Sequence, residues 1–184
     1  TKYLAGHADV MIGVATAKTQ EDWEIVKKTS VYLGYCIGGD DAYLTSRGMR
    51  TLEVRLERHQ ENGFILAQWF KGRPEVKSVL HPAFSDCTGH EFWKRDFSGA
   101  CGLFGIILKE FGGNSVTAML NGMELFGLGF SWGGFESLMI ATNPTPIRSA
   151  TTWKHKGQCL RVHAGQEDPD DLIADLEGGF KRLT

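Results

Sequence analysis

The chain has 184 residues, a length that corresponds to one domain or to one domain and part of another. Its 22 acidic and 20 basic residues give a net charge of −2, which excludes the broad basic surface of a nucleic-acid-binding protein. No apolar stretch approaches the roughly 20 residues that a membrane span needs, and four widely spaced cysteines without a CxxC pair indicate reduced thiols of a cytosolic protein rather than a disulfide framework.

The first third of the chain predicts one strand and two helices. Residues Asp9–Ala17 are β-branched and apolar, as in a short buried strand. Residues Gln20–Leu33 have apolar side chains at helical spacing and follow Thr19, so we predict a helix with Thr19 as its N-cap. A longer helix is predicted from about residue 41 to residue 71, with a break near Gly48.

The rest of the chain predicts short strands that alternate with helices. Residues 83–98 carry few regular signals and predict no element. The sequence therefore indicates an α/β region followed by an α+β region, with a boundary near residues 46–49. Strands are predicted at Val76–Leu80, Leu103–Leu108 and Cys159–Ala164, and helices at Ser115–Phe126, capped by Asn114 or Ser115, and from Pro169 onward, capped by Asp168.

Residues Gly129–Gly133 match the G-x-S-x-G pattern of serine hydrolases. That pattern needs a strand before Ser131 and a helix after it, and we consider residues 125–130 and 136–141 for these places. His163 could then act as the base, but only Glu136 lies between Ser131 and His163, where the hydrolase order requires the acid. A structural glycine-rich turn is the favoured interpretation, and a serine hydrolase remains the remote alternative.

Other polar residues of the chain are also candidates for binding sites. His81, Cys87 and His90 have metal-like spacing but no fourth ligand, so we predict no metal site. Arg161 stands inside an apolar strand, where a guanidinium needs a partner: either an acidic side chain in a structural salt bridge or the carboxylate of a ligand. The basic residues of the predicted helices alternate with acids and predict a solvated face: Lys27, Lys28, Arg47, Arg50, Arg55 and Arg58.

The beginning of the chain, Thr1–Asp9 (TKYLAGHAD), resembles the segment around the cofactor lysine in the Cys/Met-metabolism family of pyridoxal-phosphate enzymes. The family pattern is S-x-T-K-Y-x-x-G-H-S-D; Ala8 replaces its second Ser, and its first Ser would precede Thr1. Four more segments resemble the same family in the same order, so the resemblance covers nearly the whole chain. They are Tyr43–Arg50, Gly89–Phe97, Ser131–Leu138 and Leu160–Asp168.

The resemblance implies a fold-type I transferase-like architecture. Residues 1–47 would be the end of the large cofactor domain, and residues 48–184 a smaller C-terminal α+β domain with a mainly antiparallel sheet. By resemblance, Lys2 binds pyridoxal 5′-phosphate covalently and moves protons at the substrate. The other implied contacts are Thr1 to the cofactor phosphate, Arg161 to the substrate α-carboxylate, a main-chain contact from Ser131 to the same carboxylate, and Trp132 as an apolar wall.

Within the family, Ser131–Gly134 (SWGG) and Gly89–Phe97 (GHEFWKRDF) resemble the bacterial cystathionine β-lyase branch, because related branches usually carry Leu where Trp132 stands. This branch implies α,β-elimination of the small amino-acid substrate L-cystathionine in cytoplasmic methionine biosynthesis, by a homotetramer built as a dimer of dimers. The chain would then be the C-terminal half of the enzyme, with the N-terminal half as its partner. The alternative is a non-catalytic fragment or subunit that needs that half.

Overall fold

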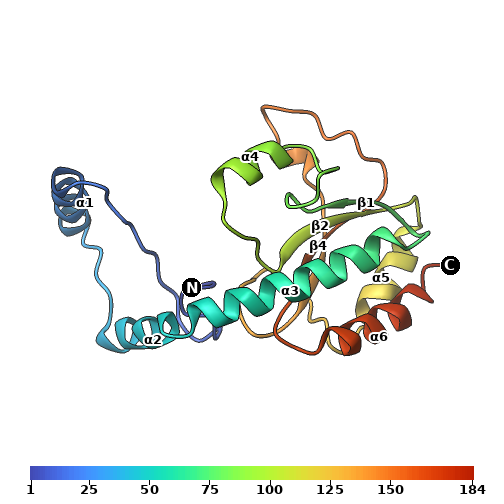
Figure 1. The fold of residues 1–184 in the computed structure, drawn as a ribbon, viewed down its shortest axis with the longest axis horizontal. Helices are drawn as coiled ribbons and strands as arrows, with labels where there is room; N and C mark the ends of the chain where they lie inside the picture. Colours follow the sequence, from blue (N-terminus) through green and yellow to red (C-terminus); the bar gives the residue numbers. More distant parts are fainter.

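The computed structural model describes residues 1–184. Residues 9–38 form an N-terminal arm that extends away from the packed body formed by most of the remaining chain (Figure 1). The arm contains α1 (Gln20–Tyr32) and leads into α2 (Gly39–Met49), which is followed by the long α3 (Leu52–Lys71). The predicted N-cap of α1 is confirmed, because the Asp22 N–H donates to the Thr19 hydroxyl oxygen at 3.1 Å. None of the helices combines the length and the apolar character needed to cross a membrane.

The body is built on a four-stranded sheet. Its strands are β1 (Val76–Leu80), β2 (Leu103–Leu108), β3 (Leu138–Thr142) and β4 (Cys159–His163), in the order β1-β2-β4-β3. Every neighbouring pair is antiparallel, which confirms the mainly antiparallel sheet. The central strand β4 brings Arg161 opposite Gly105 on β2 and Ile140 on β3.

Helices α3, α5 (Gly113–Asn121) and α6 (Pro169–Phe180) enclose the core with the sheet. Helix α3 runs along the sheet and contacts β1, β2 and α6 (Figure 1). The predicted helix after Asp168 is confirmed as α6, and its apolar residues Leu172, Leu176 and Phe180 form a stripe buried in the core. The fully buried side chains at the centre of this core are Leu66, Phe70, Ile106, Leu108, Met119, Met139, Leu160, Leu172 and Leu176.

The predicted strand Asp9–Ala17 is not formed: these residues have no regular structure, and most are exposed. A strand exists only when a neighbour accepts its backbone hydrogen bonds, and no other segment of this chain pairs with residues 9–17. Three elements are present that the sequence did not predict. They are strand β3, the short helix α4 (His90–Asp96) and a single turn of 3-10 helix, η1 (Thr145–Ile147).

Three helix boundaries also differ from the predictions. The break in the long helix lies at Arg50 and Thr51 rather than at Gly48, so the predicted domain boundary after residue 47 falls inside α2 and stays a prediction. Helix α5 starts earlier than predicted, with Gly112 as N-cap, because the Ser115 hydroxyl instead donates to the Thr184 carbonyl oxygen at 2.5 Å. It ends at Asn121, because the following residues turn away toward α6.

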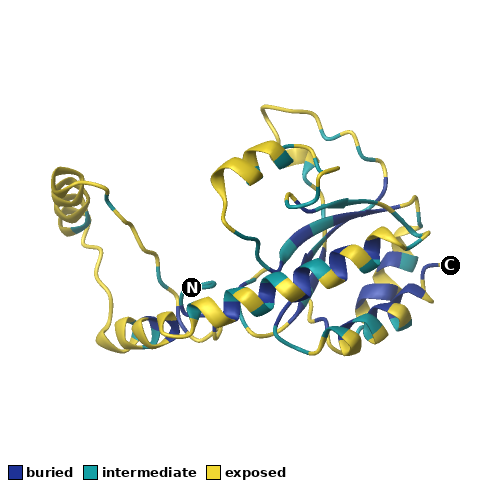
Figure 2. Ribbon diagram, viewed as in Figure 1, coloured by how far each residue is buried: buried dark blue, intermediate teal, exposed yellow.

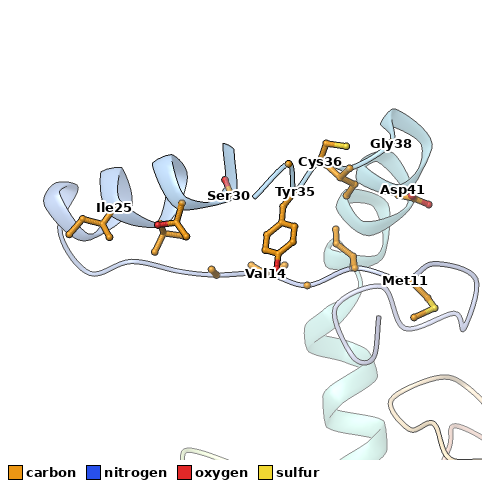
Figure 3. A pocket seen from close by; sticks show the side chains of 15 residues that line it. Met11, Val14, Ile25, Ser30, Tyr35, Cys36, Gly38 and Asp41 are labelled. Carbon is orange, nitrogen blue, oxygen red and sulfur yellow. The ribbon is translucent and has the colours of Figure 1, made fainter. Parts of the chain in front are cut away.

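The arm buries almost nothing. Helix α1 has no buried residue, and its ribbon is exposed along its length (Figure 2). Between α1, residues 11–15 and residues 34–38 lies an open cavity of about 980 Å³ (Figure 3). Nine of its 15 lining residues are hydrophobic, among them Ile25 and Val14. The arm therefore presents an apolar surface that this chain does not cover.

Candidate active site

A glycine-rich turn, residues 129–134 (GFSWGG), lies beside β4 and forms one wall of the candidate site. Arg161 on β4 holds this turn, because its Nη2 donates to the carbonyl oxygens of Gly129 and Ser131, both at 3.2 Å. The structural salt bridge considered for Arg161 is not formed, since no acidic side chain lies within ion-pair distance. Its other N–H groups make no hydrogen bond within the chain and can bind a ligand.

Trp132 lies against two cationic groups. The centroid of its ring is 5.0 Å from Lys2 Nζ and 5.3 Å from Arg161 Cζ. Lys2, like Arg161, forms no ion pair in the structure. Two positive side chains against one aromatic ring, without an acidic partner for either, create a positive potential that favours an anion. Lys2, Ser131, Trp132 and Arg161, which are distant in the sequence, are thus brought together.

Thr1 is placed beside Lys2, but its hydroxyl is engaged. The oxygen accepts from the Ile12 N–H at 2.6 Å, and the hydroxyl donates to the Ile12 carbonyl oxygen at 2.8 Å. These two bonds fold residues 1–12 into a closed loop. A phosphate group at this position would take the hydroxyl hydrogen away from the Ile12 carbonyl.

Arg55 anchors the Lys2 segment to α3. The sequence predicted a solvated side chain, and this prediction is wrong: Arg55 is buried, with 6% of its surface exposed. Its guanidinium donates to the carbonyl oxygens of Tyr3 at 2.8 Å and Gly48 at 2.7 Å. Burial lowers its pKa. The two bonded segments explain how a buried charge is tolerated: carbonyl dipoles replace water around the guanidinium.

Two buried histidines lie behind the turn. His59 on α3 donates from Nδ1 to the Ala164 carbonyl oxygen at 2.8 Å, and its ring centroid is 5.1 Å from that of His163. Burial lowers the pKa of both imidazoles, that of His163 to about 4. The Tyr3 ring packs edge-on against His59, with centroids 5.3 Å apart. Burial also raises the pKa of Tyr3 far above its ordinary value, so all three side chains are neutral.

Glu167 fastens the end of β4 to the start of β3. Its carboxylate accepts from the Ser137 N–H at 2.7 Å and from the Ser137 hydroxyl at 2.8 Å. The Ser137 oxygen in turn accepts from the Gly165 N–H at 2.8 Å, and Asn62 donates to the Gly165 carbonyl oxygen at 3.0 Å. The two strands that flank the glycine-rich turn are therefore held in a fixed relation.

Sequence reasoning missed the burial of Arg55 and Asn62 on α3, although a signal was present. Arg55, His59 and Asn62 recur at helical spacing in line with the apolar Leu66 and Phe70, and all five are buried. Polar residues within an apolar stripe predict buried hydrogen-bonding groups, because such a stripe faces the core. The missed groups connect α3 to the chain around Lys2 and to the end of β4.

The serine hydrolase alternative is contradicted by the structure. Residues 125–130 contain no strand, and residues 138–142 form β3 where that alternative requires a helix. His163 Nε2 accepts from the Gly133 N–H at 3.0 Å rather than from the Ser131 hydroxyl. The structure also brings no three His, Cys, Asp or Glu side chains together at His81, Cys87 and His90 or elsewhere.

The comparison with protein families decides the class of the chain. A family model described as "Cys/Met metabolism PLP-dependent enzyme" matches residues 1–181. The chain belongs to this family. Members depend on pyridoxal phosphate, which confirms the predicted cofactor, and the predicted resemblance is confirmed over nearly the whole chain.

Curated relatives refine the position within the Cys/Met family. The chain is 45% identical to "Cystathionine beta-lyase MetC" of Escherichia coli strain K12 over 188 residues, which cover 100% of the chain and 47% of that protein. It is 44% identical to the cystathionine beta-lyase of Haemophilus influenzae, again over 47% of the relative, and 37% identical to the cystathionine gamma-synthase of E. coli. The chain spans about half the length of the curated relatives it matches.

Solved structures confirm the fold. Cystathionine gamma synthase from Xanthomonas oryzae pv. oryzae, determined with cystathionine, matches with a TM-score of 0.87 and 32% identity, over 99% of this chain and 48% of that one. Cystathionine gamma-lyase from Lactobacillus plantarum matches with a TM-score of 0.86 and 25% identity over 99% of the chain and 49% of its own length. These are fold-type I enzymes, as predicted.

The residues around Lys2 fit pyridoxal phosphate. The Lys2 amine is free of any acidic partner, lies against Trp132 and is near an unneutralised guanidinium, so an anionic group can approach it. The adjacent turn is built from glycines, and a Cβ on Gly133 would lie 2.7 Å from the Tyr3 nitrogen. Only the Thr1 hydroxyl would have to exchange a present hydrogen bond for one to the cofactor.

Proposed function

We propose that the protein containing this chain is a pyridoxal-phosphate-dependent carbon–sulfur lyase. It splits L-cystathionine, with one water molecule, into homocysteine, pyruvate and ammonia. The observation that carries the proposal is the cluster of the Lys2 amine and the Arg161 guanidinium against one Trp132 ring. The 45% and 44% identity to two cystathionine beta-lyases, against 37% to a cystathionine gamma-synthase, supports the β-lyase reaction.

Arg161 binds the substrate α-carboxylate in this proposal. Its guanidinium presents unused N–H groups, and a planar fork of this kind matches a carboxylate with two parallel hydrogen bonds. The bonds to Gly129 and Ser131 fix one edge of the guanidinium, so the bound carboxylate is held in one orientation. Fixing the carboxylate also fixes which bond at Cα reacts, because the reacting atoms are then aligned before the chemical step.

Lys2 moves the protons. A covalently bound pyridoxal phosphate supplies an electron sink for the pair left at Cα. With the substrate bound, Lys2 Nζ would take the Cα proton and later protonate the leaving sulfur at Cβ. Trp132 keeps water from this amine on the side that it covers. Thr1 contributes a hydroxyl to the cofactor phosphate.

The upstream half of the protein is the proposed partner of the N-terminal arm. The family relatives are about twice as long as the chain, and the apolar cavity of the arm is open. We infer that the upstream half covers this surface and supplies the remaining cofactor contacts. Assembly into a homotetramer, as a dimer of dimers in the cytoplasm, is part of the same proposal.

The test uses the whole protein with cystathionine as substrate. Equal amounts of pyruvate and homocysteine are expected, because the proposal breaks the bond between sulfur and the Cβ of the three-carbon half. Release of 2-oxobutyrate and cysteine would contradict β-elimination. As a check of the site, borohydride reduction of the holoenzyme should leave one pyridoxyl group on Lys2. A label on Lys18, Lys27 or Lys28 instead would overturn the assignment of Lys2.

A further inference from the structure

Strand β4 holds the glycine-rich turn at two alternating positions. Arg161 binds the carbonyl oxygens of Gly129 and Ser131, and His163 binds the N–H of Gly133 through Nε2 at 3.0 Å. Residues two apart on a strand point to the same side, so both side chains act on the same turn. The bond to His163 is the one that holds the end of the turn nearest the Lys2 segment.

Gly133 is the point where the turn meets the Lys2 segment. Its φ of 78° lies in the left-handed region, and an added Cβ would be 2.7 Å from the Tyr3 nitrogen and 3.0 Å from the Lys2 carbonyl carbon. Backbone packs directly on backbone here. A shift of Gly133 would therefore move Trp132, the residue before it, relative to Lys2 and Arg161.

The His163 ring cannot easily move or be replaced by water. It is 1% exposed and packs on the rings of His59 and Tyr3, at centroid distances of 5.1 and 6.1 Å. Burial, the neighbouring His59 and the charge of Arg161 lower its pKa, against the Gly134 carbonyl that raises it. The imidazole is consequently neutral, and its Nε2 lone pair is available to the Gly133 N–H.

The burial of His163 also lowers the stability of the fold. Its Nδ1 has no hydrogen-bond partner, nor has Nε2 of His59. A buried polar atom without a partner destabilises a fold, and a phenyl ring of similar shape would avoid that loss. Both groups within hydrogen-bond distance of His163 Nε2 belong to the turn, the Gly133 N–H at 3.0 Å and the Gly134 carbonyl oxygen at 3.3 Å, which indicates that the imidazole holds the turn.

We propose that His163 is a positioning residue for Arg161, the residue that binds the substrate α-carboxylate. His163 accepts a hydrogen bond from the Gly133 N–H and so fixes the glycine-rich turn. The fixed turn holds Trp132 and Arg161 in the arrangement that receives the carboxylate. The proposal rests on the proposed function of Arg161. His163 does not act as a base, because its ring is buried and its Nε2 is occupied by the turn.

The experiment compares two ligands that differ only in an α-carboxylate, glycine and methylamine. Each is titrated into the whole holoenzyme while the absorbance of the bound cofactor is followed, so no turnover is needed. The wild type should bind glycine more tightly than methylamine. His163→Phe keeps a ring but loses the acceptor, and it should lose about tenfold or more of that preference. His163→Gln can accept with Oε1 and should keep the preference within about threefold.

His59→Phe is the matched control, because it removes the neighbouring buried imidazole without touching the turn. It should leave the preference for glycine unchanged even if it alters stability. If His163→Phe does not retain cofactor, His163→Leu is the second variant without an acceptor, with the same expected loss. A preference equal to that of the wild type in these variants would overturn the positioning role. A wild type without any preference would instead contradict the clamp, and with it both proposals.

Discussion

The N-terminal arm exposes its apolar side chains, whereas the packed body buries them. Val31 and Tyr32 on α1 are 63% and 76% exposed, whereas Leu66 and Phe70 on α3 are fully buried. Both helices satisfy their own backbone hydrogen bonds, and α1 even has the better N-cap. The difference is the presence of a second surface: α3 packs on a sheet and on α6, and nothing in this chain packs on α1. Local signals make a helix, but only a facing layer makes a core.

The largest expected effect is on backbone protection. In the isolated chain, the amides of residues 9–17 other than Ile12 should exchange hydrogen near the rate of an unfolded peptide, because no strand pairs with them and only the Ile12 N–H is held, by the Thr1 hydroxyl. Amides of Ile106–Leu108 in β2 should exchange at least about a thousandfold more slowly, because their hydrogen bonds break only when the whole body unfolds. Exchange measured residue by residue tests this.

Adding the upstream half should slow exchange across residues 9–17 and leave β2 unchanged. The reason is that the upstream half would supply the strand neighbours that the arm lacks. Strong protection of residues 9–17 in the isolated, monomeric chain would contradict the division into an uncovered arm and a self-supporting body.

The next effect concerns matched aromatic truncations. Phe70→Ala should lower the free energy of unfolding by about 3–5 kcal/mol, because the ring is fully buried and packs on Phe104 and Phe180. Tyr32→Ala in the arm should change it by less than about 0.5 kcal/mol, since the side chain is 76% exposed. Urea unfolding of both variants of the isolated chain tests this. Equal losses would show that the arm belongs to the same cooperative unit.

The smallest of the three effects is the pH dependence of the free energy of unfolding, which arises from histidines of the body. Burial lowers the pKa of His163 from its usual 6.5 to about 4, so below pH 6.5 the unfolded chain binds a proton that the folded chain does not. Stability should therefore be full above about pH 6.5 and fall toward pH 4, by about 3 kcal/mol from this residue. Burial of His59 and His81 acts in the same direction.

Urea unfolding at several pH values between 4 and 7 measures the slope. His163→Gln should make the slope shallower, because the variant removes one of the three buried histidines whose protonation is suppressed by folding. His7→Gln is the matched substitution at an exposed histidine. A slope that survives in His163→Gln would mean that other groups dominate the acid response.

The sequence predicted only part of the cluster around Lys2. Short motifs around Lys2, Trp132 and Arg161 identified the family and its cofactor. They did not reveal that Trp132 contacts both cations, or that Arg161 binds the turn. The contact between Lys2 and Trp132 joins distant parts of the chain, and those of Arg161 with Gly129 and Ser131 join residues 32 and 30 positions apart. A motif describes only its own neighbourhood.

The sequence by itself determined the local elements whose signals are contained in a few residues. The N-caps Thr19 and Asp168, the strands at 76–80 and 103–108 and the apolar stripe of α6 follow from hydrogen-bonding side chains and periodicity. Tertiary structure alone decided the fate of residues 9–17, the burial of Arg55 and the place of His163. A strand needs a neighbour, a buried charge needs carbonyl groups around it, and a buried imidazole needs a donor. Each of these partners comes from a distant part of the chain, or, for residues 9–17, is not supplied by this chain at all.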